Sequence, residues 1–141
     1  MKCVVVPIEE GRDSTWAVEH VIGLYRQEPL RVFLLNVQPS LPHYVARFIR
    51  KAELQAFHRE NGMRALERAI ERLDGAGVPH TDRVLVGRKA EMIVDFARKV
   101  SCAQIILPKP SAGLLPSLGL GSIGSQLRHL IGAGCDICEV Y

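Results

Sequence analysis

The sequence lacks any long hydrophobic run. No apolar stretch approaches the ~20 residues that a membrane-spanning helix needs. Because 48% of the residues are nevertheless hydrophobic, short buried elements must carry them. The first apolar stretch starts at Cys3, which is too early for a secretory signal, and it is also too short for one. We therefore expect a cytoplasmic protein with no membrane segment.

An excess of charge of one sign is also lacking. The chain has 18 Lys and Arg residues against 15 Asp and Glu residues, which gives a formal net charge of +3. Many of the basic residues stand among acidic ones at helical spacing, as between Arg64 and Arg72, and this pattern is typical of a solvated helix face. We therefore expect no nucleic-acid partner.

Clustered metal ligands are absent from the sequence as well. The five histidines are scattered, and among the four cysteines only Cys135 and Cys138 form a C-x-x-C pair. On a strand, two such residues lie about 10 Å apart and face opposite sides, whereas a disulfide needs Cα atoms within roughly 7 Å. We expect buried structural cysteines and no metal site.

Five short apolar segments have the pattern of β-strands, and helical patterns separate them. The segments are residues 3–8, 31–37, 81–86, 104–107 and 137–141. The first is apolar almost throughout, which is typical of a strand covered on both faces. The alternation predicts an α/β fold in one domain, residues 1–141: a three-layer, doubly wound, five-stranded parallel sheet with strand order 3-2-1-4-5.

The longest helical pattern runs from residue 43 to residue 74, and its apolar stripe includes Val45 and Ile49. One helix of that length would measure about 50 Å, whereas a domain of this size has a radius of gyration of about 14 Å. The helix is therefore expected either to overhang the body of the protein or to bend at Asn61–Gly62, where glycine weakens it.

The predicted strand order places strands one and four side by side where the winding reverses. Ligands of such sheets bind outside the carboxyl ends of the strands at that point. The two loops expected there are Pro7–Ser14 and Pro108–Ser122. The second loop is rich in Gly, Pro and Ser and leads into a helix, whose free N–H groups and positive dipole end favour anions. These two loops are the predicted binding site.

No nucleophile, base and acid occur at a recognisable spacing. Two segments match nucleotide-binding motifs in part, but their sequence context does not support that function. Gly119–Gly124 matches G-x-G-x-x-G, but a strand does not directly precede it. Glu9–Ser14 partly resembles the phosphate loop of the ATP pyrophosphatases, yet its two glutamates would repel a phosphate. A helix cap at Asp13 or Ser14 is the favoured interpretation. We therefore expect no enzyme, and an adenylating enzyme of the pyrophosphatase type is the least favoured function.

Across its whole length the sequence resembles the universal stress protein family. The matching segments are Val4–Glu9, Leu35–Val37, Gly121–Ser122 and Gly134–Ile137. The resemblance implies a Rossmann-like fold of the adenine nucleotide alpha hydrolase type. It also implies a homodimer that pairs through the C-terminal strand, residues 137–141, whose exposed edge would suit such pairing.

ATP-binding members of that family carry G-x-x-G, nine residues, then G-[S/T]. Here the final Gly121–Ser122 is present, but the two earlier glycine positions fall on Pro108 and Ser111. Glycine lets the backbone approach a phosphate closely, whereas proline lacks the N–H donor and fixes φ. Glu9 stands where the family has an aspartate. These departures weaken the expected grip on ATP.

Two functions stay open on this basis. The first is a small non-catalytic stress-response module that acts as a homodimer without a nucleotide. The second is the same fold with ATP or another adenine nucleotide as a switch, with at most slow hydrolysis. The candidate nucleotide contacts are Glu9, Asn36, Val37, Pro108, Lys109, Ser111, Gly121 and Ser122.

Overall fold

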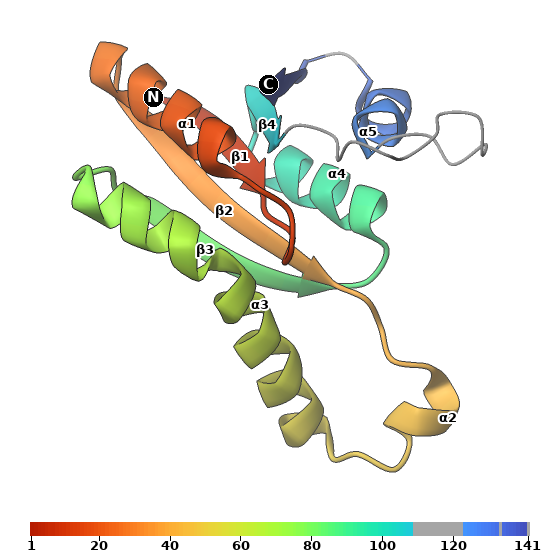
Figure 1. Cartoon of the computed structure of the whole chain (residues 1–141). Helices are drawn as coiled ribbons and strands as arrows, with labels where there is room; N and C mark the ends of the chain where they lie inside the picture. The colour runs from red at the N-terminus through yellow and green to blue at the C-terminus, as the bar shows by residue number, and fades with distance from the viewer. Residues whose placement is uncertain (109–122, 133, 141) are drawn as a thin grey trace.

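The computed structural model describes residues 1–108, 123–132 and 134–140, and it shows strands and helices in alternation (Figure 1). The elements are β1 (Lys2–Pro7), α1 (Thr15–Gln27), β2 (Leu30–Gln38), α2 (His43–Ala46), α3 (Lys51–Gly75), β3 (His80–Val86), α4 (Lys89–Lys99), β4 (Gln104–Pro108), α5 (Ile123–Ile131) and β5 (Asp136–Val140). All five predicted strands are present, with bounds that differ by a few residues at most.

The five strands form one sheet in the order β3-β2-β1-β4-β5, and every neighbouring pair is parallel. This confirms the predicted doubly wound sheet and its strand order. Pro7 at the end of β1 pairs with Leu35, and Pro108 at the end of β4 pairs with Val140. The carboxyl ends of the strands therefore meet at one edge, where the binding site is predicted.

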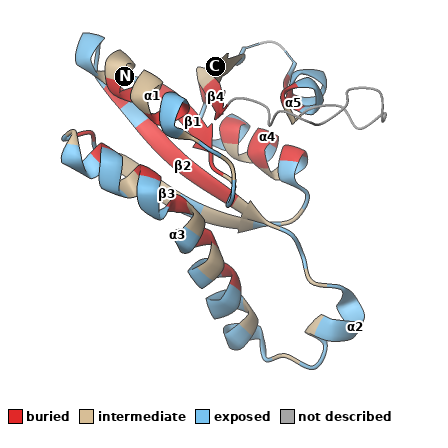
Figure 2. Cartoon of the chain, viewed as in Figure 1, coloured by how far each residue is buried: buried red, intermediate tan, exposed pale blue. Residues whose placement is uncertain are grey.

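Helices cover both faces of the sheet, and alternate residues of β1 separate the two cores. Val4 and Val6 pack with α1 and α3, whereas Cys3 and Val5 pack with α4 and α5. Figure 2 shows the buried residues concentrated in the central strands and on the helix faces that meet them. The uninterrupted burial from Cys3 to Pro7 confirms that β1 is covered on both faces.

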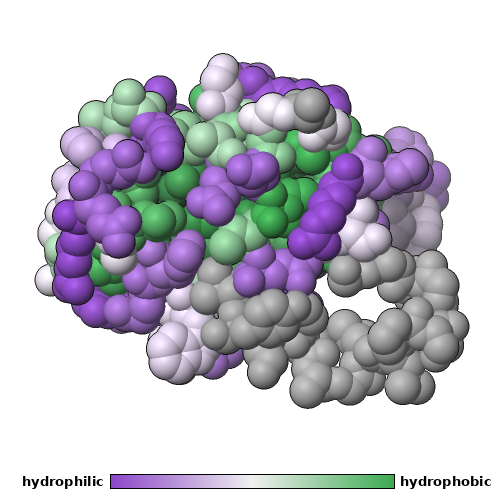
Figure 3. All heavy atoms as spheres, turned by 90° about the horizontal axis from the view of Figure 1, so that it is seen from above, coloured by the Kyte–Doolittle hydropathy of each residue, from purple (hydrophilic) through white to green (hydrophobic). Residues whose placement is uncertain are grey.

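The two edge strands are less buried than the centre. In β5, Ile137, Cys138 and Glu139 are only partly buried. β4 and β5 lie near the top of Figure 1, and the view from above shows apolar surface between polar side chains (Figure 3). A partly apolar edge is compatible with pairing to a second copy, which stays a prediction.

The cysteines fit their predicted structural role only in part. All four are free thiols, and Cys3 and Cys102 are buried as expected. Burial raises the pKa of both thiols, which keeps them protonated and unreactive. Cys135 and Cys138 were predicted to be buried but are only partly so, because Cys138 lies in the edge strand β5 and Cys135 directly precedes it.

The segment predicted as one long helix is two helices. The helical pattern breaks at residues 47–50, and Arg50 has an extended backbone. Val45 and Ile49 belong to the predicted apolar stripe, but Val45 is exposed and Ile49 is only partly buried. α2 and the first half of α3 project beyond the sheet (Figure 1), so the expected overhang is present.

Gly62 does not interrupt the helix, because α3 runs unbroken from Lys51 to Gly75. A Cβ atom at Gly62 would clash with Cγ1 of Val84 in β3. The glycine therefore allows α3 to pack closely on the edge of the sheet. No helix in the described part of the chain is both long enough and apolar enough to cross a membrane.

Candidate functional site

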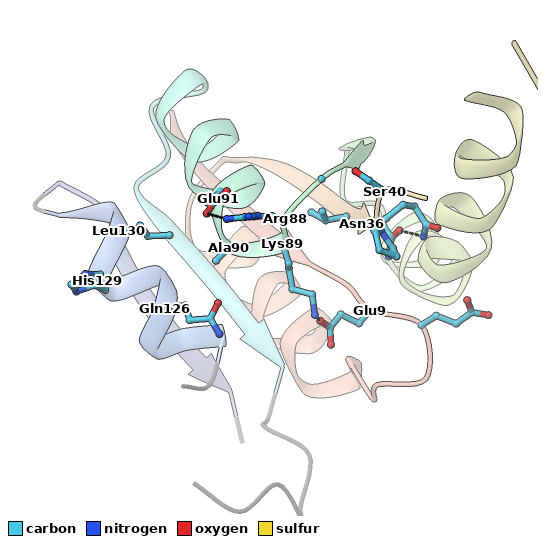
Figure 4. Close-up of a pocket in the computed structure, with 15 residues that line it drawn as sticks. Glu9, Asn36, Ser40, Arg88, Lys89, Ala90, Glu91, Gln126, His129 and Leu130 are labelled. Atoms are coloured by element: carbon cyan, nitrogen blue, oxygen red, sulfur yellow. Dashed lines mark hydrogen bonds and ion pairs between the residues drawn. The ribbon is translucent and has the colours of Figure 1, made fainter. Parts of the chain in front are cut away.

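A large open cavity lies at the carboxyl ends of the strands (Figure 4). It has a volume of about 1250 Å³, and its walls come from the loop after β1, the end of β2, the start of α4 and one face of α5. A narrower recess adjoins it, and its lining includes Glu9, Lys89 and Pro108. The predicted loop after β1 and the end of β4 therefore meet, as the strand order required.

Asn36 holds two of these strand ends together. Its side chain is buried, and its Nδ2 donates a hydrogen bond to the carbonyl oxygen of Ile8 at 2.8 Å. Its Oδ1 accepts a hydrogen bond from Nε2 of Gln38 at 2.6 Å. Because Ile8 directly precedes Glu9, the amide of Asn36 fixes the place where Glu9 leaves β1. A ligand would meet an amide that is already engaged.

Glu9 lies between two cations. Its Oε2 is 3.4 Å from Nη1 of Arg12, and its Oε1 forms an ion pair with Nζ of Lys89. Figure 4 shows the Lys89 side chain extending from the start of α4 toward Glu9. Burial lowers the pKa of Lys89 below its ordinary value, since desolvation penalises the charged amine. The carboxylate at the predicted ligand position is thus neutralised from within the protein.

Lys89 is a site residue that the sequence analysis missed. A hydrogen bond from the backbone N–H of Gly87 to the carbonyl oxygen of Gln38, 3.0 Å long, places the start of α4 beside the end of β2. The available signal was two consecutive basic residues, Arg88 and Lys89, at the start of the helix after β3. The carboxyl end of β3 lies at the same edge of the sheet as the predicted loops.

The predicted contacts fall into two groups. Glu9, Asn36 and Val37 line the large cavity, and Pro108 joins Glu9 and Val37 around the recess, so the structure brings these four together. Lys109, Ser111, Gly121 and Ser122 lie outside the described residues, and their roles stay predictions. In the described ranges, no group of His, Cys, Asp and Glu side chains could hold a metal ion.

The arrangement suits recognition of a ligand better than chemistry on it. A carboxylate between an ammonium and a guanidinium group can exchange partners with a charged ligand. Pro108, as the last residue of β4, offers no backbone N–H to such a ligand. The side-chain cations beside Glu9 in the described part of the crevice are Lys89 and Arg12, and Glu9 already engages both. Arg88 also lines the cavity, where it pairs with Glu91.

Comparison with known proteins gives a consistent family assignment. A model of the universal stress protein family matches residues 1–131. No curated protein matches the sequence.

Solved structures of the same fold cover nearly the whole chain. A universal stress protein from Archaeoglobus fulgidus in complex with dAMP is 14% identical, with a TM-score of 0.68 over 100% of this chain and 98% of that one. A family member from Arabidopsis thaliana with AMP bound is 15% identical, with a TM-score of 0.66 over 100% and 93%. A universal stress protein in complex with cAMP is 19% identical, with a TM-score of 0.71 over 99% and 97%.

Proposed function

Because the chain belongs to the universal stress protein family, we propose that it is a non-catalytic stress-response module that acts as a cytoplasmic homodimer and does not retain ATP. The observation that carries the proposal is the ion-paired state of Glu9. A triphosphate entering the crevice would meet this carboxylate and would have to take Lys89 and Arg12 away from it. Pro108 provides no compensating backbone donor.

The experiment is to purify the protein, denature it, and measure released small molecules by absorbance and mass. No nucleotide is expected. Addition of ATP and Mg²⁺ should leave the melting temperature of the parent unchanged. The double variant Pro108→Gly with Ser111→Gly should gain a rise in melting temperature with ATP, because two glycines permit close approach of the backbone to phosphate. Stoichiometric ATP released from the parent would refute the proposal.

The homodimer is proposed to form through β5. This strand is the edge of the sheet beside β4, and its described side chains are partly exposed. Truncation after Gly134 should give either an insoluble protein or a soluble protein that is a monomer in sedimentation velocity. Removal of Tyr141 alone leaves β5 in place and should preserve the dimer. A dimer that survives the longer truncation would assign the interface elsewhere.

A second candidate function is an adenine-nucleotide switch that takes a ligand with fewer phosphates. Three structural neighbours hold AMP, dAMP or cAMP, and Lys89 and Arg12 could serve a single phosphate group with less displacement of Glu9. Thermal shifts with AMP, cAMP and ATP separate the two functions. A rise in melting temperature with AMP or cAMP but not with ATP would favour the switch.

A further inference from the structure

The part of the molecule that projects farthest from the sheet exposes large apolar side chains to solvent. This projecting tip consists of residues 41–51, which form α2 and its connection to α3 (Figure 1). Phe48 is 78% exposed and Tyr44 is 67% exposed. Figure 2 shows α2 as an almost entirely exposed element. Exposed aromatic side chains gathered in one segment are typical of an interaction surface.

The same tip is positively charged. Arg47, Arg50 and Lys51 are exposed, and the sequence has no acidic residue between Glu28 and Glu53. Across the described ranges, no carboxylate forms an ion pair with any of these three cations. The guanidinium group of Arg47 lies over the Phe48 ring at 4.8 Å. Apolar and cationic groups are therefore interleaved in one short segment.

We propose that the projecting tip is a peripheral docking site for membranes that contain anionic lipids. Such a surface offers anionic headgroups to Arg47, Arg50 and Lys51 and an apolar boundary to Tyr44 and Phe48. For the cytoplasmic location proposed above, the surface of this kind is the cytoplasmic leaflet of a membrane, which carries anionic lipids. This inference does not depend on the occupant of the crevice.

Charge and shape argue against other occupants. A symmetric contact between two copies through the tip would bring the same three cations together, which is repulsive. A bound peptide needs a groove, whereas α2 lies at the end of a projection (Figure 1).

A single-stranded nucleic acid fits the tip less well than a lipid surface does. Nucleic acids stack their bases on open aromatic faces, but Arg47 lies over the ring of Phe48. The tip also contains aliphatic residues, Leu41, Val45 and Ile49, which provide nothing for a base to hydrogen-bond. Aliphatic and aromatic side chains together suit the boundary between headgroups and acyl chains.

The test is co-sedimentation of the full chain with vesicles. We expect binding to vesicles of phosphatidylcholine with phosphatidylserine, and little binding to vesicles of phosphatidylcholine alone. Added salt should weaken the binding, since the electrostatic attraction is screened. The double variant Tyr44→Ser with Phe48→Ser, which removes the apolar groups, should also lower the affinity.

A matched pair of charge variants locates the site. Arg50→Glu with Lys51→Glu should lower the affinity for anionic vesicles by at least about tenfold. Arg26→Glu with Lys99→Glu makes the same change in net charge away from the tip and should retain most of the binding. Folding of both variants is checked by their melting temperatures, because Arg26 and Lys99 lie in the last turns of α1 and α4, where a carboxylate opposes the helix dipole. A carboxylate at the start of α3 suits the helix dipole, so the fold is expected to persist.

Four results would overturn the proposal. The first is a parent that does not bind anionic vesicles, and the second is an equal loss of binding in both charge variants. The third is tip-dependent binding of a fluorescent single-stranded oligonucleotide without binding of vesicles. The fourth is an oligomer in sedimentation velocity that Phe48→Ser dissociates, which would make the tip an interface between copies of the chain.

Discussion

Two charged clusters lie at opposite ends of the parallel strands, and their net charges have opposite signs. After the end of β1, the Glu9 carboxylate sits between Arg12 and Lys89. At the start of β3, the His80 ring sits between two carboxylates, with Nδ1 2.6 Å from Asp82 and Nε2 2.7 Å from Asp74. Each cluster places one group between two partners that favour its charged form.

The two clusters differ in what surrounds them. The His80 side chain is only 8% exposed and joins the end of α3 to the start of β3. The Glu9 side chain is 27% exposed and lines the large cavity. In this enclosed cluster the His80 ring is buried, whereas the Asp74 carboxylate is 65% exposed. The buried ring contributes to folding, because its two hydrogen bonds cannot be exchanged for water at low cost. A cluster beside a cavity can exchange partners with a ligand, so its charges bear on binding more than on stability.

The largest expected effect is on the enclosed cluster. His80→Ala removes both hydrogen bonds, so the carboxylates of Asp74 and Asp82 lose the ring that they share. We expect it to lower the free energy of unfolding by about 2 kcal/mol. Urea denaturation measures the loss. His129→Ala is the control, because His129 is exposed on α5 and its replacement should cost no more than about 0.5 kcal/mol. Equal effects of the two variants would contradict the contrast.

The next effect concerns binding at the open cluster. Glu9→Gln removes the negative charge and leaves Lys89 and Arg12 free to meet a phosphate. Affinity for ATP should rise about tenfold, or ~1.4 kcal/mol, in calorimetric titration at low salt. Glu10→Gln is the matched control, since Glu10 lines the same cavity but is exposed. If both variants gain equally, net charge and not the position of Glu9 governs binding.

The pH dependence of stability should also follow the enclosed cluster. Burial alone would lower the pKa of His80, but its hydrogen bonds and charge interactions with Asp74 and Asp82 outweigh burial and raise the pKa above its ordinary value. A raised pKa in the folded state means that the stabilisation is complete below the unfolded pKa, about 6.5, and is lost as the pH rises through the folded pKa.

The variant His80→Asn tests this pH dependence. The difference in unfolding free energy between parent and variant should be greatest near pH 6 and should shrink toward pH 9, measured by urea denaturation. A difference that grows with pH would show that His80 works as a neutral group.

The contrast also explains which parts of the structure were predictable. The strands and their order follow from short apolar runs that alternate with helices, and Cys3–Ile8 is the clearest case. The meeting of Glu9 with Pro108 follows from that order. His80 is one of five histidines scattered along the sequence, but His80 and Asp82 have the spacing of neighbours on one strand face. Asp74 joins them only through the tertiary packing of α3.

The break between α2 and α3 was not predictable from periodicity. Val45 and Ile49 continue the apolar stripe of α3, so the pattern does not predict that a helix ends at residues 47–50. Periodicity shows which side chains share a face, but not whether another element covers that face. The exposure of Tyr44 and Phe48 depends on how far the tip projects beyond the sheet. That distance is set by where α3 packs on β3, at Gly62 and Val84.

The smallest expected effect is on the stability contributed by the open cluster. Lys89→Met breaks the ion pair with Glu9, but the Lys89 side chain is 41% exposed and Arg12 still pairs with the carboxylate. The cost should stay below about 1 kcal/mol. Arg88→Met, which breaks an exposed pair with Glu91, provides the matched control. A loss of unfolding free energy near that of His80→Ala would make Lys89 a structural residue. A ligand could then displace Lys89 from Glu9 only at a large cost in stability.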